Sequence, residues 1–330
     1  MTSKNLGRKA GSKQAAKPRR PHDVLVLATM SAGKSSFINA LVGRELLPSA
    51  NEATTACLTS IEHRRTARSF RGACYSHAGS RMFTESDASI DQVRAWNANA
   101  EVKHIRLTGN FRTRPSLARG LVLHDTPGPN NSQDERHGAM MLEAVRTVPF
   151  QTMLYVLNAG QLGTWDDRRL LEQVRDLLGD PSGHQVVFIL NKVDLLDPER
   201  GEDLAGCVSK ARQYLEGLGF ADPIIVPTMA NLALYARKAL HAEPLTRVER
   251  SKLRQSLEDL AVDNQSSLHA AAMPDAVRAR VIRDLKKAGR TRRTAPDGIP
   301  TAEVAALEQL VVHSGIRTVE FLLNQPSTMD

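Results

Sequence analysis

The sequence VLVLATMSAGKSSFINALV, at residues 24–42, decides the fold. Its first five residues are a continuous apolar run, which predicts a buried parallel strand. From residue 35 to residue 42, apolar side chains recur on one helical face, which predicts a helix. The loop between them carries a phosphate-binding pattern, with Ala28 where the first glycine is usual. The segment therefore predicts a strand, a phosphate-binding loop and a helix.

The loop chemistry suits phosphate, because backbone N–H groups can surround a phosphate while the helix N-terminus adds a favourable dipole. Gly33 permits close backbone approach, Lys34 can reach the β and γ oxygens, and the Ser35 hydroxyl can bind Mg²⁺. We expect Lys34 to lie near the surface. An ordinary strand-to-helix turn is the alternative. The predicted nucleotide contacts of this loop are Ser31, Ala32, Gly33, Lys34, Ser35 and Ser36.

A second segment, Asp125-Thr126-Pro127-Gly128, follows another buried strand. The Asp125 carboxylate can hold the hydration shell of Mg²⁺, and the Gly128 N–H can contact the γ-phosphate. Taken alone, these four residues also suit a simple β-turn. Their position after a strand favours the phosphate site.

A third segment, Asn191-Lys192-Val193-Asp194, predicts the base. The Asp194 carboxylate can accept hydrogen bonds from N1–H and the N2 amino group of guanine, whereas adenine would leave it unsatisfied. Asn191 would brace the loop, and the Lys192 stem would cover one face of the base. Three such segments in this order favour GTP over ATP.

Apolar runs predict a chain of alternating strands and helices. The strands are expected at 24–28, 102–107, 121–124, 153–157, 186–190 and 223–227, with one or two more within 56–76. The helices are expected at 35–42, 86–98, 134–147, 165–178 and 202–218. This order predicts an α/β fold, a mostly parallel sheet with helices on both faces, followed by a short C-terminal helical appendage.

Composition and charge place the chain among globular proteins. Its 330 residues are 41% apolar, and its three cysteines form no C-x-x-C pair, which excludes a disulfide scaffold and a zinc ribbon. A reducing, cytoplasmic compartment is expected, with neither a secretory signal nor a membrane-spanning run. The net charge of +8 comes mostly from residues 1–22, which hold seven basic and no acidic residues. We expect them to be a disordered tail, either a solubilising arm or a contact for nucleic acid or anionic lipid.

The motifs resemble those of the translation-factor-related GTPases. Four surrounding stretches further resemble the bacterial dynamin-like proteins, particularly the branch associated with the replication clamp: residues 31–41, 47–48, 54–56 and 125–130. The resemblance covers roughly residues 22–240. It implies that residues 23–245 form a dynamin-type GTPase (G) domain. Charge sets residues 1–22 apart as the basic tail, and the lack of strand patterns after about residue 232 indicates a helical region at 246–330, a truncated or minimal stalk or bundle.

Further roles follow from the resemblance alone. Thr55, or its neighbour Thr54, would give a hydroxyl to Mg²⁺ and an N–H to the γ-phosphate, although two threonines can also begin a strand. Ser31 would help to hold a monovalent cation, K⁺ or Na⁺. The Met229-Ala230 loop would contact guanine O6. The implied catalytic set is Lys34, Ser31, Thr55 and Gly128.

Departures from the dynamin pattern concern catalysis. Dynamins place a glutamine that orients water where this chain has Met30, and Pro129 stands where small GTPases have their glutamine. Dynamins also complete the site across a head-to-head dimer with an acidic residue, where this chain has Gln161. We expect a GTPase that binds GTP and GDP and is stimulated by homodimerisation. The alternative is a slow-cycling module that recruits a partner to membrane or DNA.

Dynamins carry a long helical stalk, whereas about 85 residues follow residue 245 here. We therefore expect either a fragment or a minimal GTPase that works with a stalk-bearing subunit or a DNA-replication component. Peripheral membrane or nucleoid association would accompany these partners. A C-terminal basic cluster suits either a solvated helix face or binding to anionic lipid or nucleic acid: Arg278, Arg280, Arg283, Lys286, Lys287, Arg290, Arg292 and Arg293.

Overall fold

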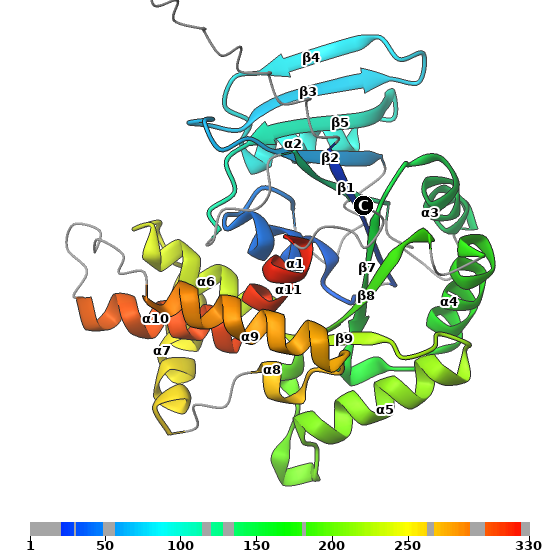
Figure 1. The fold of residues 1–330 in the computed structure, drawn as a ribbon. Coiled ribbons are helices and arrows are strands. Elements are labelled where there is room, and N and C mark those ends of the chain that lie inside the picture. Colours follow the sequence, from blue (N-terminus) through cyan, green and yellow to red (C-terminus); the bar gives the residue numbers. More distant parts are fainter. Residues whose placement is uncertain are drawn as a thin grey trace, which may run out of the picture.

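The computed structural model describes residues 21–29, 31–48, 57–113, 120–127, 135–179, 183–262, 267–290 and 301–324. In these segments nine strands form one sheet, in the order β4-β3-β5-β2-β6-β1-β7-β8-β9 (Figure 1). The strands are β1 His22–Ala28, β2 Leu58–His63, β3 Arg71–Ser76, β4 Arg81–Glu85, β5 Val102–Gly109, β6 Leu121–Asp125, β7 Thr152–Asn158, β8 Gln185–Asn191 and β9 Ile224–Thr228.

The sheet is mostly parallel, as predicted. Strands β6, β1, β7, β8 and β9 run parallel to one another, and β2 pairs in parallel with β5. The β2–β6, β3–β5 and β3–β4 pairs are antiparallel. Because β6, β1, β7, β8 and β9 share one direction, the loops after them emerge at one edge of the sheet.

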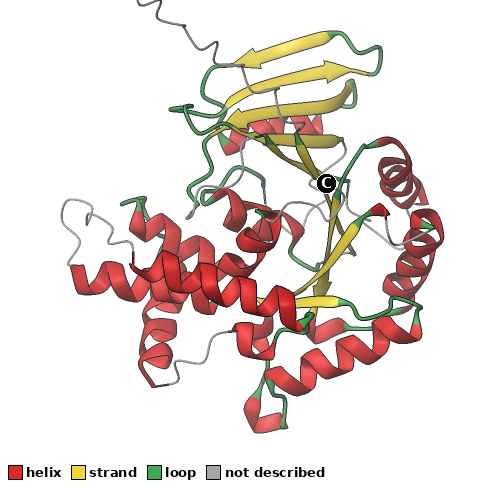
Figure 2. Cartoon of the chain, in the orientation of Figure 1, coloured by secondary structure: helices red, strands yellow, loops and turns green. Residues whose placement is uncertain are grey.

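Helices cover both faces (Figure 2). Their bounds are α1 Lys34–Val42, α2 Ile90–Ala98, α3 Glu135–Thr147, α4 Trp165–Leu178, α5 Leu204–Gly217, α6 Ala230–Leu240, α7 Arg247–Val262, α8 Ser267–Ala270, α9 Asp275–Arg290, α10 Thr301–His313 and α11 Ile316–Leu323. Short 3-10 turns lie at η1 Ala159–Gln161, η3 Val193–Leu195 and η4 Pro198–Arg200.

Alternation along β1 divides the core in two. Val24 and Val26 pack in one apolar cluster with side chains of α1, α6 and α11. Leu25 and Leu27 pack in a second cluster with side chains of α3, α4 and α5. A strand that is buried on both faces needs a continuous apolar run, which is the pattern found at residues 24–28.

The sheet edge differs from the sequence prediction. Region 56–76 forms two strands, β2 and β3, and β4 follows where no strand was predicted. The β4 sequence Arg-Met-Phe-Thr-Glu is mostly exposed, so it lacks the apolar alternation on which the prediction relied. Its antiparallel pairing with β3 stabilises it as an edge strand. Helix α2 begins at Ile90, because Ser89 caps it by accepting from the Gln92 N–H.

The C-terminal helices pack against the α/β core. Helix α10 lies beside α6 (Figure 1), and all eight residues of α11 are buried. The Arg237 guanidinium on α6 contacts both the Ala40 carbonyl oxygen on α1 and the Glu320 carboxylate on α11. The predicted boundary near residue 245 falls between α6 and α7, and the helices beyond it return to the face that α1 covers.

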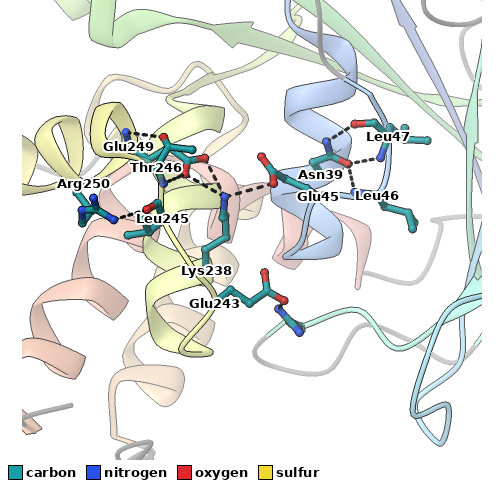
Figure 3. A network of polar contacts seen from close by, with 11 residues as sticks. Asn39, Glu45, Leu46, Leu47, Lys238, Glu243, Leu245, Thr246, Glu249 and Arg250 are labelled. Atoms are coloured by element: carbon teal, nitrogen blue, oxygen red, sulfur yellow. Dashed lines mark hydrogen bonds and ion pairs between the residues drawn. The ribbon is translucent and has the colours of Figure 1, made fainter. Parts of the chain in front are cut away.

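A second polar network holds α7 to the loop after α1 (Figure 3). Lys238 Nζ donates to both Glu249 carboxylate oxygens at 2.9 and 3.1 Å and lies 3.3 Å from Glu45 Oε2. Thr246 and Glu249 form a capping box at the start of α7, at 3.2 and 2.6 Å. In the loop after α1, which contains Glu45, the Asn39 side chain forms hydrogen bonds with the backbone of Leu46 and Leu47. No helix in the described segments has the length and apolar character to cross a membrane.

Candidate functional site

The phosphate loop follows β1 and ends at the first turn of α1. Gly33 is the N-cap of α1, with φ at +86°, and Ser31 has φ at +60°. Glycine suits the first position, because a Cβ there would lie 2.7 Å from Asn191 Nδ2. Ser31 is exposed, Ala32 is buried, and Ser35 and Ser36 lie half-buried in the first turn of α1.

Lys34 lies differently from our expectation, since its side chain is buried and only 8% exposed. Its ammonium contacts the Asp125 carboxylate, which is 1% exposed, and the Thr126 carbonyl oxygen. The reason is the sheet order, because β6 neighbours β1 and brings Asp125 beside the phosphate loop. Two opposite charges in a buried setting attract each other strongly.

The donor set beside Lys34 suits Mg²⁺. The Ser35 hydroxyl is on the first turn of α1, and the buried Asp125 carboxylate ends the adjacent strand. Mg²⁺ prefers hard oxygen ligands and is held in proteins by one or two such groups with water. The two residues therefore fit the predicted ion.

Asn191 joins the base segment to the phosphate loop. Its Nδ2 donates to the Ala32 carbonyl oxygen at 2.9 Å. Its Oδ1 accepts from Thr228 Oγ1 and from the Ala230 N–H, both at 3.2 Å. Asn191 is buried and lies opposite Thr228 in the register of β8 and β9. One amide thus connects the loops that follow three strands, β1, β8 and β9.

The remaining predicted base residues lie in the loops after β8 and β9. Lys192 has a left-handed backbone, with φ at +65°, and Asp194 lies exposed in η3 directly after it. Met229 and Ala230 lie at the start of α6, where their N–H groups donate to the Ser314 carbonyl oxygen at 2.9 Å and to Asn191. Either group would have to exchange its partner before it could contact guanine O6.

The stretch 158–167 contacts the phosphate loop from another side. Asn158 Nδ2 lies 3.4 Å from the Ser31 carbonyl oxygen and 3.1 Å from Gln161 Oε1. Asn158 Oδ1 accepts from the Gly160 N–H at 3.1 Å. Gln161, the residue in the place of the dynamin acid, is therefore linked through Asn158 to the phosphate loop.

The last residue of this stretch, Asp167 in the first turn of α4, carries a buried carboxylate. Its Oδ1 accepts from Tyr155 at 3.2 Å and from Thr29 of the phosphate loop at 3.5 Å, and its Oδ2 accepts from Tyr214 at 3.1 Å. Burial raises the pKa of Asp167, although the three hydroxyl donors oppose that shift. Burial and the Asp167 charge raise the pKa of Tyr155 as well.

Some predicted site residues lie outside the described segments: Met30, Thr54, Thr55, Gly128 and Pro129. Their roles stay predictions. Sequence reasoning expected residues 158–167 to lie against the phosphates in a dimer, but it gave no individual role to Asn158, Thr29 or Asp167, which contact the phosphate loop or belong to it. Only the position of residues 158–167 directly after a buried strand could have indicated them.

Comparisons with known proteins agree on one family. Residues 24–193 match the model of the Dynamin family. Over 203 residues the chain is 30% identical to a bacterial dynamin-like protein of Nostoc punctiforme, a similarity that covers 58% of this chain. The chain spans 28% of the length of that relative.

Two solved structures also resemble this chain, and both are described as an oligomerised bacterial dynamin pair in the sensing and tethering of membranes. Both are 15% identical, with TM-scores of 0.45 over 63% of this chain and 0.48 over 81% of it. The similarity covers 30% and 41% of the solved chains. The family match spans more than half of the chain, and it includes the phosphate loop, Asp125 and residues 191–193 of the base segment. This chain belongs to the Dynamin family.

Proposed function

We propose that this chain binds Mg²⁺ and GTP and hydrolyses GTP by attack of water on the γ-phosphate. The observation that carries the proposal is the bond from Asn191 of the base segment to Ala32 of the phosphate loop. Asp125 lies at the same edge of the sheet, in contact with Lys34. Segments far apart in the sequence thus supply groups for phosphate, metal and base within one site, which favours a single nucleotide ligand.

Each residue has a role in the proposal. Lys34 and the N–H groups of residues 31–36 bind the phosphates, while Asp194 pairs with guanine and Lys192 covers the ring. Ser35, Thr55 and Asp125 hold Mg²⁺, which when bound neutralises charge on the phosphate oxygens. Because Lys34 contacts Asp125 in the structure, binding of a triphosphate would move the ammonium from the carboxylate to the phosphate.

Dimerisation would complete the catalytic site. Met30 and Pro129 cannot orient a water molecule, so an isolated head should turn over slowly. A second head that closes over the first would exclude bulk water and press residues 158–167 against the phosphates. The Asn158 contact with Ser31 supports this route, because it already links that stretch to the phosphate loop. Ser31, Thr55 and Gly128 join Lys34 as the proposed catalytic set, with K⁺ or Na⁺ bound near Ser31.

The second candidate is a slow-cycling module that binds GTP and recruits a partner. Gln161 favours it, because an amide lacks the charge of the acid that dynamins have there. The exposed Arg280, Arg283 and Lys286 of α9 would suit an anionic membrane surface or DNA. Under this candidate the chain works in the cytoplasm, at the membrane or the nucleoid, with a stalk-bearing subunit or a replication component. Under either candidate, we also propose that the chain belongs to the replication-clamp branch and divides into a basic tail at 1–22, a G domain at 23–245 and a helical region at 246–330.

Equilibrium binding tests the proposal. Non-hydrolysable analogues of GTP and ATP are titrated into the full chain with Mg²⁺ by calorimetry, and Lys34→Ala is compared with Lys103→Ala. Lys103 is an exposed lysine on β5, so its replacement removes the same charge away from the site. We expect binding of the GTP analogue alone, lost in Lys34→Ala and kept in Lys103→Ala. Equal binding of both analogues would contradict the guanine assignment.

A further inference from the structure

A cavity of about 380 Å³ lies where the C-terminal helices meet the α/β core. Its wall comes from the loop after β2, the segment after β5 and helices α6, α10 and α11. The basic and acidic residues of its wall are Arg65, Arg112, Arg237, His241, Arg317 and Glu308. None of the cavity residues belongs to the nucleotide site described above.

Basic groups dominate the wall. Four arginines and one histidine line the cavity, against one carboxylate, that of Glu308. Arg237 and Arg317 are 3% and 4% exposed, so their guanidinium groups are nearly removed from bulk water. A cavity whose wall carries an excess of basic groups attracts a ligand of the opposite charge.

Internal ion pairs offset this charge only in part. Glu320 contacts both Arg237 and Arg317, Glu308 lies 3.1 Å from Arg317, and Glu243 contacts Arg112. Among the described residues, three carboxylates therefore face four guanidinium groups, which leaves one guanidinium in formal excess. The excess is at Arg65, an exposed arginine with no ion pair among the described residues.

The wall is held in place before any ligand arrives. The Arg112 N–H donates to the Val42 carbonyl oxygen at 2.8 Å, and a Cβ at Gly43 would lie 2.7 Å from Arg112 Cβ. Glu243, which contacts Arg112, lies in the connection between α6 and α7. Lys238 of α6 donates to Glu249 of α7 and so fixes the two helices on either side of that connection (Figure 3). The Thr113 hydroxyl, also in the wall, is buried and has no hydrogen-bond partner in the described chain. A prearranged site loses less conformational entropy on binding.

We propose that this cavity binds a compact phosphomonoester, with Arg65 and Arg112 as its principal contacts. The planar guanidinium fork matches the geometry of phosphate oxygens, and a hydroxyl donor such as Thr113 can bond a further oxygen. The volume lies in the range of small-ligand sites. The phosphomonoester can be a free metabolite or the headgroup of a lipid. The wall includes the loop after β2 and the segment after β5 on the core side, and α10 and α11 on the C-terminal side. A ligand bound between them would therefore hold the C-terminal helices to the core.

Calorimetric titration with glycerol 3-phosphate tests the proposal at constant ionic strength, on the wild type, Arg65→Gln and Arg64→Gln. Arg64 is the exposed neighbour, paired with Glu62 at 3.0 Å and absent from the wall, so its replacement changes the charge equally. Any binding at the phosphate loop is common to all three proteins. Phosphatidylcholine vesicles with and without phosphatidic acid form the second arm, read by co-sedimentation.

We expect saturable binding by the wild type, weakened about tenfold in Arg65→Gln and unchanged in Arg64→Gln. Binding of the soluble ester alone identifies a free metabolite, and an added Arg65-dependent attachment to the phosphatidic acid vesicles identifies a lipid headgroup. Absence of saturable binding in both arms would overturn the proposal. An equal loss in Arg64→Gln would overturn it too, because the effect would then be general surface charge.

Discussion

The side-chain amide of Asn191 donates a hydrogen bond to the Ala32 carbonyl oxygen at 2.9 Å. The two residues are 159 positions apart in the chain; Asn191 is the last residue of β8, and Ala32 lies in the loop that follows β1. The same amide accepts from Thr228 and Ala230. The loop for the phosphates and the loop for the base are therefore positioned by one buried group, and a change at either loop should affect the other.

Gly33→Ala tests this link. The new Cβ would lie 2.7 Å from Asn191 Nδ2, and the backbone would keep a φ of +86° that alanine rarely adopts. Gly79→Ala is the control, because Gly79 has φ at +79° with no heavy atom within 4 Å of the added Cβ. By urea unfolding, we expect Gly79→Ala to lower the free energy of unfolding by about 1 kcal/mol. Gly33→Ala should lower it further and also abolish GTP binding. Equal effects of both variants on both readouts would show that the Asn191 contact is unimportant.

Asp194→Asn should change the base preference. The new amide can donate to the C2 oxygen of xanthine, whereas it can no longer accept twice from guanine. Loss of such a charge-assisted pair corresponds to about 1.5–3 kcal/mol of binding free energy. In a competition between GTP and xanthosine triphosphate followed by calorimetry, the variant should therefore prefer xanthosine triphosphate, whereas the wild type prefers GTP. If GTP stays preferred by the same factor, the base lies elsewhere.

The buried Asp167 should make stability depend on pH. The native pKa of Asp167 lies above the ordinary value of 3.8. At any pH between 3.8 and the native pKa, the native state therefore binds more protons than the unfolded state. Stability should consequently rise as pH falls through the native pKa, and the gain should be complete below 3.8. Urea unfolding of the wild type and Asp167→Asn is compared at several values between about pH 4 and pH 7. We expect the difference in unfolding free energy to shift in favour of the wild type as pH falls. A difference that stays constant with pH would argue against the raised pKa.

Glu320→Gln should destabilise the contact between α11 and the core. The carboxylate is fully buried and contacts the buried Arg237 and Arg317, so its neutralisation leaves two guanidinium groups without that charge. Breaking a buried ion pair from one side costs about 3–5 kcal/mol of stability. Glu308→Gln is the matched control, because Glu308 contacts Arg317 with a side chain that is 25% exposed. It should cost less than Glu320→Gln, because the Glu308 carboxylate lies closer to solvent. Similar losses in the two variants, measured by chemical unfolding, would contradict this account of α11.

Local patterns were sufficient for the elements that hold the site. The run at residues 24–28 predicted β1 because a strand covered on both faces needs apolar side chains throughout. The glycine at position 33 predicted the loop, because only a residue tolerant of positive φ suits the start of α1 there. Tertiary contacts were beyond such patterns. Strand β4 depends on pairing with β3, and the position of Lys34 depends on β6 being next to β1.

Side-chain contacts at the site also depend on the fold. Asn191 was predicted as a brace, but its partner Ala32 is set by the order of the strands. In the sequence, Asp167 is an ordinary acidic residue in the first turn of a helix. Its burial and its hydrogen bonds from Tyr155 and Tyr214 arise only in the folded protein. The cavity between α6, α10 and α11 arises from residues of five separate segments, none of which has a binding motif of its own.

Phosphate release is the most direct test of the central claim, measured with GTP and with ATP over about a hundredfold range of protein concentration. We predict release from GTP alone, with a specific activity that rises with concentration as heads dimerise. Sizing of the chain with GDP and fluoroaluminate should show a dimer, whereas GDP alone should leave a monomer. Release from ATP at the same rate as from GTP, or no release from either nucleotide, would contradict the assignment of this site to GTP hydrolysis.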